Sequence, residues 1–253
     1  VSVPRFREGV PMAKGKRKAS PTRVTSDGDA LLAAVIANPD EDTPRLIYAD
    51  WLEENGQPDR AEFIRTHIEV THLPADDPKA STLRKRVLEL AKDHGQQGAN
   101  AGGVFFGVFV RGLLTAARFD ELEEFCDEAP EVLAHHPLRV VYAGDFYPEF
   151  SESKVVGCPH FSRLTGLGSS SRGWGGDVVA LALTNPHLSA LRMLDFNNRD
   201  YNGTGGARGI AVATHLTNLL VLDLSGNVIG DEGVEALAGA KHLASLRALR
   251  LRT

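Results

Sequence analysis

The sequence predicts an α/β protein in which a helical N-terminal domain precedes a short solenoid of strand-and-helix units. Residues 29–95 carry apolar side chains at helical spacing between helix start and stop signals. Residues 104–110 and 113–119 have the composition of strands, and from residue 138 a pattern of leucines recurs. We expect the repeated part to place a parallel sheet on a concave face and helices on the convex face.

Composition favours a soluble globular protein. The chain has 253 residues, of which 42% are hydrophobic and 24% charged. No apolar run approaches the ~20 residues that a membrane-spanning helix needs. The two cysteines, Cys126 and Cys158, allow at most one disulfide. Cysteine this sparse is typical of a reducing compartment, so the sequence predicts a cytoplasmic protein without membrane contact.

Positive charge is concentrated at the N-terminus. Residues 1–28 hold seven basic and two acidic side chains, a charge of +5, and the whole chain has a net charge of −5. The remainder therefore carries −10. We expect this Pro-, Lys-, Arg- and Ser-rich tail to be disordered. A basic tail can bind nucleic acid, but Lys14–Lys18 is a short run without aromatic residues, so a solvated terminus is favoured.

Helix signals define a domain over residues 29–100. A first helix is expected to end at Asn38-Pro39. Thr43 is expected to cap a second helix with Pro44 in its first turn, and Gly56 to end it. Two further helices follow, one from Pro58 and one from Asp77-Pro78 to His94-Gly95.

Residues 101–137 are expected to connect this domain to the repeats and to cap the first edge of their sheet. Two strands flank a turn at Arg111-Gly112, and short helices follow near residues 120–126 and 130–135.

The repeats occupy residues 138–253. One complete unit reads Leu219-x-x-Leu222-x-Leu224-x-x-Asn227-x-Ile229. Similar units start 27 residues later at Leu246 and 28 residues earlier at Leu191, and degenerate units are expected at Phe161/Leu164 and at Leu138/Val141. The leucines should point into the core, and the Asn should bond backbone groups of the turn, so that stacked units share an Asn ladder.

Residues 191–253 resemble leucine-rich repeats of the ribonuclease-inhibitor-like class. The resemblance implies a parallel-sheet horseshoe that binds proteins. Arg199 stands at the ladder position of the 191 unit, and Thr253 precedes the ladder position of the last unit. We therefore expect the last repeat to be incomplete, either because the chain is truncated or because a partner covers its strand.

The helical domain has a resemblance of its own. The run Tyr48-Ala-Asp-Trp-Leu-Glu-Glu54 with Ala61-Glu-Phe-Ile-Arg65 is similar to the bacterial repeat-companion domain, which is usually found just upstream of leucine-rich repeats. The resemblance implies a context for this domain and no activity.

Three groups of residues are candidates for catalytic or ligand chemistry. Asp50, Glu53 and Glu54 lie close on one helix, as an acid–base site would, but a solvated face paired with Arg45 or Arg65 is favoured. His135-His136 and Cys158-Pro-His160 lack the spacing of a metal site. In residues 203–209 Arg208 stands where a dinucleotide loop needs its third glycine, which favours a glycine-rich repeat turn.

The remaining candidate site is the concave face, where side chains alternate with the inward leucines. We expect a non-catalytic interaction module, with no cofactor, that binds a protein or peptide there. Alternatives are an enzyme with the carboxylate site and a nucleic-acid-binding tail. The residues expected on the face are Arg192, Met193, Asp195, Asn197, Leu220, Val221, Asp223, Ser225, Arg247, Ala248, Arg250 and Arg252.

Overall fold

The structure is a computed structural model that describes residues 26–74, 76–99, 106–144, 152–169, 180–197 and 203–251. The chain forms two compact units. The first comprises Val1–Ala116 with Glu131–Pro137, and the second comprises Ala117–Pro130 with Leu138–Thr253. Within these described ranges, seven strands form one sheet in chain order, from β1 to β7, which makes this a mixed α/β fold with a mostly parallel sheet.

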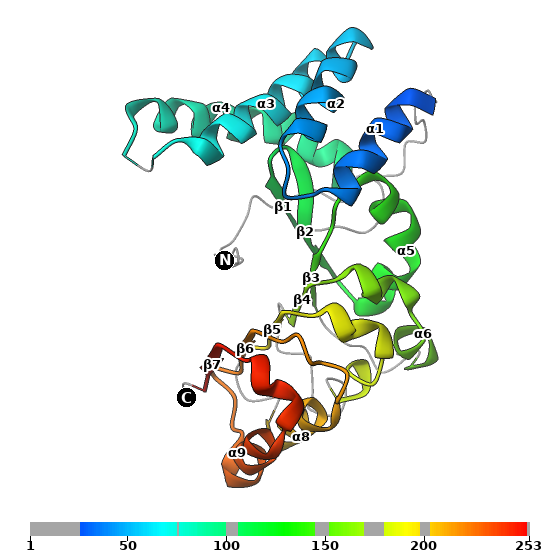
Figure 1. Cartoon of the computed structure of the whole chain (residues 1–253), viewed down its shortest axis with the longest axis vertical. Helices are drawn as coiled ribbons and strands as arrows, with labels where there is room; N and C mark the ends of the chain where they lie inside the picture. Colours follow the sequence, from blue (N-terminus) through cyan, green and yellow to red (C-terminus); the bar gives the residue numbers. More distant parts are fainter. Residues whose placement is uncertain are drawn as a thin grey trace. The chain divides into compact units, whose positions relative to one another are not determined.

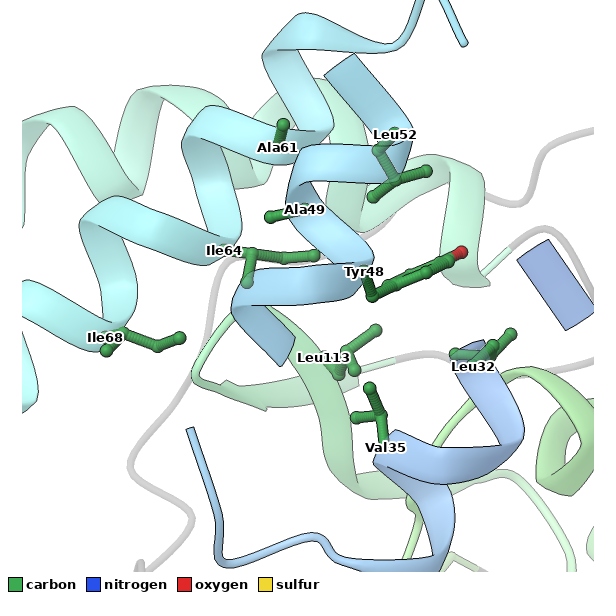
Figure 2. Close-up of a cluster of buried hydrophobic side chains, with 9 residues drawn as sticks. All are labelled: Leu32, Val35, Tyr48, Ala49, Leu52, Ala61, Ile64, Ile68 and Leu113. Carbon is green, nitrogen blue, oxygen red and sulfur yellow. The ribbon is translucent and has the colours of Figure 1, made fainter. Parts of the chain in front are cut away.

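The first unit contains four helices in its described part. They are α1 (Ser26–Ala37), α2 (Thr43–Glu54), α3 (Pro58–His72) and α4 (Pro78–Ala99). Figure 2 shows apolar side chains of α1, α2 and α3 converging, with Leu113 of strand β2 (Leu113–Phe119) among them. These helices pack in sequence, α1 on α2, α2 on α3 and α3 on α4. Among the described residues, no helix combines the length and the apolar character that a membrane crossing requires.

Two aromatic side chains of α2 contribute to the core of the first unit. Tyr48 is buried in the cluster, and Trp51 packs against the cluster from a half-buried position. Their rings stack with centroids 6.1 Å apart. Both side chains therefore serve the helical core.

The start of α2 differs from the prediction. Thr43 is the first helical residue, and Asp42 takes the N-cap position without a capping side-chain hydrogen bond. The Asp42 carboxylate instead pairs with Arg111, Oδ1 to Nε 3.0 Å, and with His72, Oδ2 to Nε2 2.5 Å. The prediction that Thr43 caps α2 is therefore wrong. Ion pairs to distant residues hold the start of α2 in place of a local side-chain hydrogen bond.

Two other helix boundaries also differ. Helix α4 continues to Ala99, past Gly95, where a stop was expected. A single glycine costs a helix only about 1 kcal/mol, so it does not have to end one. Helix α5 (Leu122–His135) is one helix with Pro130 inside it, where two short helices were expected.

The first two strands form the expected hairpin. Strands β1 (Phe106–Val110) and β2 (Leu113–Phe119) are neighbours in the sheet and turn at Arg111-Gly112. Both turn residues have positive φ, 52° and 79°. A side chain at Gly112 would also meet Ile64, since an ideal Cβ would lie 2.6 Å from its Cα. Both the turn and its packing on α3 therefore require glycine at position 112.

The second unit repeats a strand and a helical segment. Its strands are β3 (Val140–Ala143), β4 (Gly166–Ser169), β5 (Met193–Asp195), β6 (Val221–Asp223) and β7 (Ala248–Arg250). They lie side by side in parallel, in chain order (Figure 1). The helical segments are α6 (Glu152–Val156), η1 (Pro159–Arg163), η2 (Pro186–Ala190), α8 (Gly203–Val212), α9 (Gly230–Gly239) and η3 (Lys241–Ser245).

One row of side chains forms the centre of this unit's core. Its members occupy the same register position in successive strands: Val141, Leu167, Leu194, Leu222 and Leu249. The first four are fully buried, whereas Leu249 is 46% exposed. Leu249 lines an apolar groove of about 400 Å³ together with residues of α9, including Val234 and Leu237. The core is thus open beside β7.

The predicted Asn ladder position is confirmed at Asn227. Its side chain is 4% exposed. Its Nδ2 donates to the carbonyl of Leu224 at 2.9 Å in the same unit and to that of Phe196 at 2.8 Å in the preceding unit. One amide thereby satisfies carbonyls of two consecutive turns. Arg199, at the equivalent position of the preceding unit, lies outside the described residues.

Residues 203–209 form a helix, so the expected glycine-rich turn is wrong. They open α8, which packs on α9. An ideal Cβ at Gly209 would lie 2.5 Å from the Cα of Ala180. A glycine in this helix therefore permits a close backbone approach, and the tertiary contact overrides its low helix propensity.

Candidate protein-binding face

The face of β3–β7 opposite the buried leucine row is called the open face below. Strand side chains alternate, so this face carries two rows, one on each side of the leucine row. The strand register aligns both rows across all five strands. One row is Val140, Gly166, Met193, Val221 and Ala248, and the other is Tyr142, Gly168, Asp195, Asp223 and Arg250.

The first row is apolar throughout. Gly166 leaves a hollow between its neighbours, and the side chains of Met193 and Val140 lean over it. An ideal Cβ at Gly166 would lie 2.9 Å from Cε of Met193 and 3.0 Å from Cγ2 of Val140. Met193 is consequently only 6% exposed, while Val221 and Ala248 remain half-buried. The row offers a shallow apolar strip that solvent still reaches.

The second row is polar and internally bonded. The Tyr142 ring lies over Gly168, with Cε1 2.6 Å from an ideal Cβ there. This position lets the phenol reach across β4, where its hydroxyl donates to Oδ2 of Asp195 at 3.4 Å. On the next pair of strands, Nη1 of Arg250 donates to Oδ2 of Asp223 at 3.2 Å. The row thus links β3 to β5 and β6 to β7 through side chains.

Both aspartates also close the turn that follows their own strand. Oδ1 of Asp195 accepts from the backbone N–H of Asn197 at 3.3 Å. Oδ1 of Asp223 accepts from that of Ser225 at 3.1 Å. One carboxylate oxygen therefore fixes the local turn and the other accepts from a side chain of another strand, which holds the polar row in a defined conformation.

The structure places the sequence-predicted face residues at different depths. Asp223 is 5% exposed and Met193 is buried as well. Asp195, Leu220, Val221, Ser225 and Ala248 are half-buried, and Arg192, Asn197, Arg247 and Arg250 are exposed. Arg252 lies outside the described residues. Arg192, Leu220 and Arg247 stand immediately before their strands, where the backbone carbonyls of Arg192 and Leu220 accept hydrogen bonds from the next unit.

Four residues of the face were not predicted: Val140, Tyr142, Gly166 and Gly168. They follow Leu138 and Leu164. The expected unit at Phe161/Leu164 is three residues out of register, because Leu164 takes the position of Leu219 and not that of Leu222. Counting two and four residues from each of those leucines finds all four positions, because the spacing matches that of the complete unit. The signal was therefore present, although the two glycines obscured it.

The rows together present apolar contact area, carboxylates, a phenol and a guanidinium. Such mixed surfaces are typical of protein recognition, in which apolar and aromatic anchors are surrounded by polar groups. Arg250 is the exposed cation of the polar row. Its partner Asp223 is buried beside it, so the guanidinium is oriented before any partner arrives.

The carboxylates of α2 have a different environment. Arg65 bonds Asp50 and Glu53, each at 2.6 Å, and both carboxylates are exposed. These hydrogen bonds, the one to Asp50 foremost, raise the pKa of the Arg65 guanidinium. Glu54 is exposed on the same helix. This is the arginine-paired surface that the sequence favoured, with Arg65 as the partner, and Arg45 is buried and donates to the Glu41 carbonyl at 2.7 Å.

The histidine and cysteine candidates do not converge. Within the described residues, no group of three or more His, Cys, Asp or Glu side chains is arranged to hold a metal ion. His135 is exposed with Nδ1 2.9 Å from the Glu131 carbonyl, whereas His136 is buried. Residues 1–25 of the basic tail lie outside the described part of the chain.

Comparison with known proteins bears on one repeat. A family model described as Leucine Rich repeat matches residues 215–238, which include β6, the ladder residue Asn227 and most of α9. No curated protein and no solved structure matches the chain. Residues 215–238 are therefore similar to a leucine-rich repeat, in agreement with the pattern at Leu219–Ile229.

Proposed function

We propose that this chain is a non-catalytic interaction module that binds a protein or peptide on the open face. The observation that carries the proposal is the registered pair of rows on five parallel strands. The apolar row leaves Val140, Val221 and Ala248 within reach of solvent, and the polar row places an oriented Arg250 alongside them. The leucine-rich-repeat match at residues 215–238 supports the same class of function.

The proposal extends to the arrangement of the chain. Residues 138–253 would form a leucine-rich-repeat solenoid of the ribonuclease-inhibitor-like class, with the open face as its concave surface. Residues 29–100 would form a repeat-companion-like domain, residues 101–137 would cap the first strand of the solenoid, and residues 1–28 would be a tail. Extended concave surfaces are the usual binding feature of such stacks.

The experiment compares two matched double variants with the parent chain. Val221→Arg with Arg250→Glu changes one solvent-accessible residue of each row on the open face. Val234→Arg with Arg208→Glu makes the same chemical changes on α9 and α8, where Val234 and Arg208 are exposed. Circular dichroism and thermal unfolding establish that all three chains are folded.

Each chain is immobilised and exposed to lysate of its own source, and retained proteins are identified by mass spectrometry. The proposal expects a protein that the parent and the helix-side variant retain and the open-face variant loses. Retention by the open-face variant at the parent's level contradicts the proposal. Loss with the helix-side variant alone would place the binding site at α8 and α9.

A further inference from the structure

The two cysteines lie together although 31 residues separate them in the sequence. Cys126 belongs to α5, and Cys158 immediately precedes η1. Both thiols are free, and a hydrogen bond joins their side chains. Both residues belong to the second compact unit, so their proximity is a property of that unit alone.

Contacts on either side of the cysteines hold the same segments together. Phe125, next to Cys126, stacks on Phe161 of η1 with ring centroids 5.7 Å apart and an interplanar angle of 11°. Asp127, on the other side of Cys126, pairs with Lys154 of α6 at 2.6 Å. Three consecutive residues of α5 thus contact the segment 154–161 in turn. The ring stacking and the ion pair therefore hold these segments together without any contribution from the two thiols.

The environments of the two sulfurs differ. Cys158 is 3% exposed, whereas Cys126 is half-buried. The Asn185 side chain also fixes the backbone at Cys158, since its Nδ2 donates to the Cys158 carbonyl at 3.1 Å. The pair therefore has one rigid, enclosed member and one member that small solutes can reach.

We propose that Cys126 and Cys158 form a redox-active dithiol that a hydroperoxide converts into an intramolecular disulfide. The inference does not depend on the open face or on its partner. A hydroperoxide is the appropriate oxidant class because it is small enough to reach an enclosed sulfur beside a half-buried one. A dithiol reductant would restore the two thiols.

The steps balance with hydrogen peroxide as the oxidant. The Cys158 thiolate attacks one peroxide oxygen, the O–O bond breaks, and the released hydroxide takes up the proton that Cys158 had lost, forming water. Cys158 is then a sulfenic acid. The Cys126 sulfur attacks the Cys158 sulfur, the S–O bond breaks, and the hydroxyl leaves as a second water with the Cys126 proton. Two thiols are oxidised and one peroxide is reduced.

The surroundings of Cys158 favour it as the thiolate. The hydrogen bond from Cys126 lowers the pKa of the Cys158 thiol, and the backbone N–H groups of His160 and Phe161 lower it further. The same hydrogen bond raises the pKa of Cys126, which stays protonated. The nucleophile and the resolving thiol are thereby assigned to different residues.

The test treats the reduced, folded full chain with a small excess of hydrogen peroxide. Free thiols are counted by maleimide labelling in denaturant, and peptide mapping by mass spectrometry locates any cross-link. We expect both thiols to disappear together, a cross-link between Cys126 and Cys158 within one chain, and recovery of both thiols with dithiothreitol. The folded chain should cross-link roughly tenfold faster than the same chain in urea, since the fold holds the sulfurs together.

Single variants separate the two roles. In Cys126→Ser, Cys158 should stop at the sulfenic acid, which dimedone traps. In Cys158→Ser, Cys126 should remain a free thiol, because it is the resolving thiol and the thiolate that attacks peroxide has been removed. The proposal is overturned if the folded parent keeps both thiols, cross-links only between chains, or cross-links no faster than in urea. Because these outcomes are read on the parent, they hold even if a variant fails to fold.

Discussion

Arg250 of β7 and Asp223 of β6 form a hydrogen-bonded ion pair across adjacent parallel strands, Nη1 to Oδ2 3.2 Å. The two ends of this pair differ in burial, because the Asp223 side chain is almost enclosed and the Arg250 side chain is exposed. The pair therefore belongs both to the framework of the sheet and to the surface that a partner would contact.

This asymmetry predicts unequal costs for the two truncations. Asp223→Ala should lower the free energy of unfolding by about 1–3 kcal/mol, since it also removes the acceptor for the Ser225 N–H. Arg250→Ala should cost less than about 1 kcal/mol, because exposed ion-pair partners contribute little. Urea unfolding of both variants measures the two values. Equal losses of unfolding free energy in the two variants would show that the polar row does not depend on Asp223 for its structure.

Asn227 should contribute more to stability than an exposed asparagine of the preceding unit. Asn227→Ala leaves the carbonyls of Phe196 and Leu224 without their amide donor in a buried position, so we expect a loss of about 1–3 kcal/mol. Asn197→Ala serves as the control, because its side chain is exposed, and should stay within about 0.5 kcal/mol of the parent. Thermal or urea unfolding measures the free energy of unfolding of both variants and the parent. A similar value for both variants would contradict the ladder role.

Two helical glycines should respond in opposite directions to alanine. Gly209→Ala would place a Cβ 2.5 Å from the Ala180 backbone, which forces α8 to shift, and we expect a loss of about 1–3 kcal/mol. Gly239→Ala meets nothing within 4 Å at the end of α9 and should gain up to about 1 kcal/mol. The free energy of unfolding of each variant gives the sign. Stabilisation by Gly209→Ala would exclude the close approach as the reason for glycine there.

His67 should make the first unit sensitive to mild acid. Burial lowers its pKa from 6.5 to about 4, and its Nδ1 accepts a hydrogen bond from the Gly112 N–H at 3.2 Å. The unfolded chain then binds a proton more readily than the folded chain between these two pKa values. The contribution of neutral His67 to the free energy of unfolding is therefore fully present above pH 6.5, and it is lost as the pH falls toward 4.

The expected loss is about 2 kcal/mol between pH 7.5 and pH 5. His67→Gln keeps an acceptor for the Gly112 N–H and does not titrate. Between pH 7.5 and pH 5, the variant should therefore lose about 2 kcal/mol less unfolding free energy than the parent. The difference between parent and variant removes the contribution of other titrating groups. Identical pH dependence in the two chains would rule out a buried neutral His67.

The sequence by itself determined the features that depend on local periodicity. The leucine spacing placed Leu222 in the core and Asn227 in the turn, and alternation along the strand placed Val221 and Asp223 on the opposite face. Helices α1–α3 begin and end near the predicted residues, because Pro44, Gly56 and Pro58 act through their own backbone conformations.

Tertiary structure decided whatever depends on residues far apart in the chain. Residue 209 of α8 is glycine because the Ala180 backbone leaves no room for a side chain, and Asp42 pairs with Arg111 instead of capping α2. Register alone brings Tyr142 to Asp195, and the packing of α5 brings Cys126 to Cys158. Periodicity specifies which face a residue occupies within its own element. It does not specify the neighbour that it meets there, because that depends on how separate elements pack.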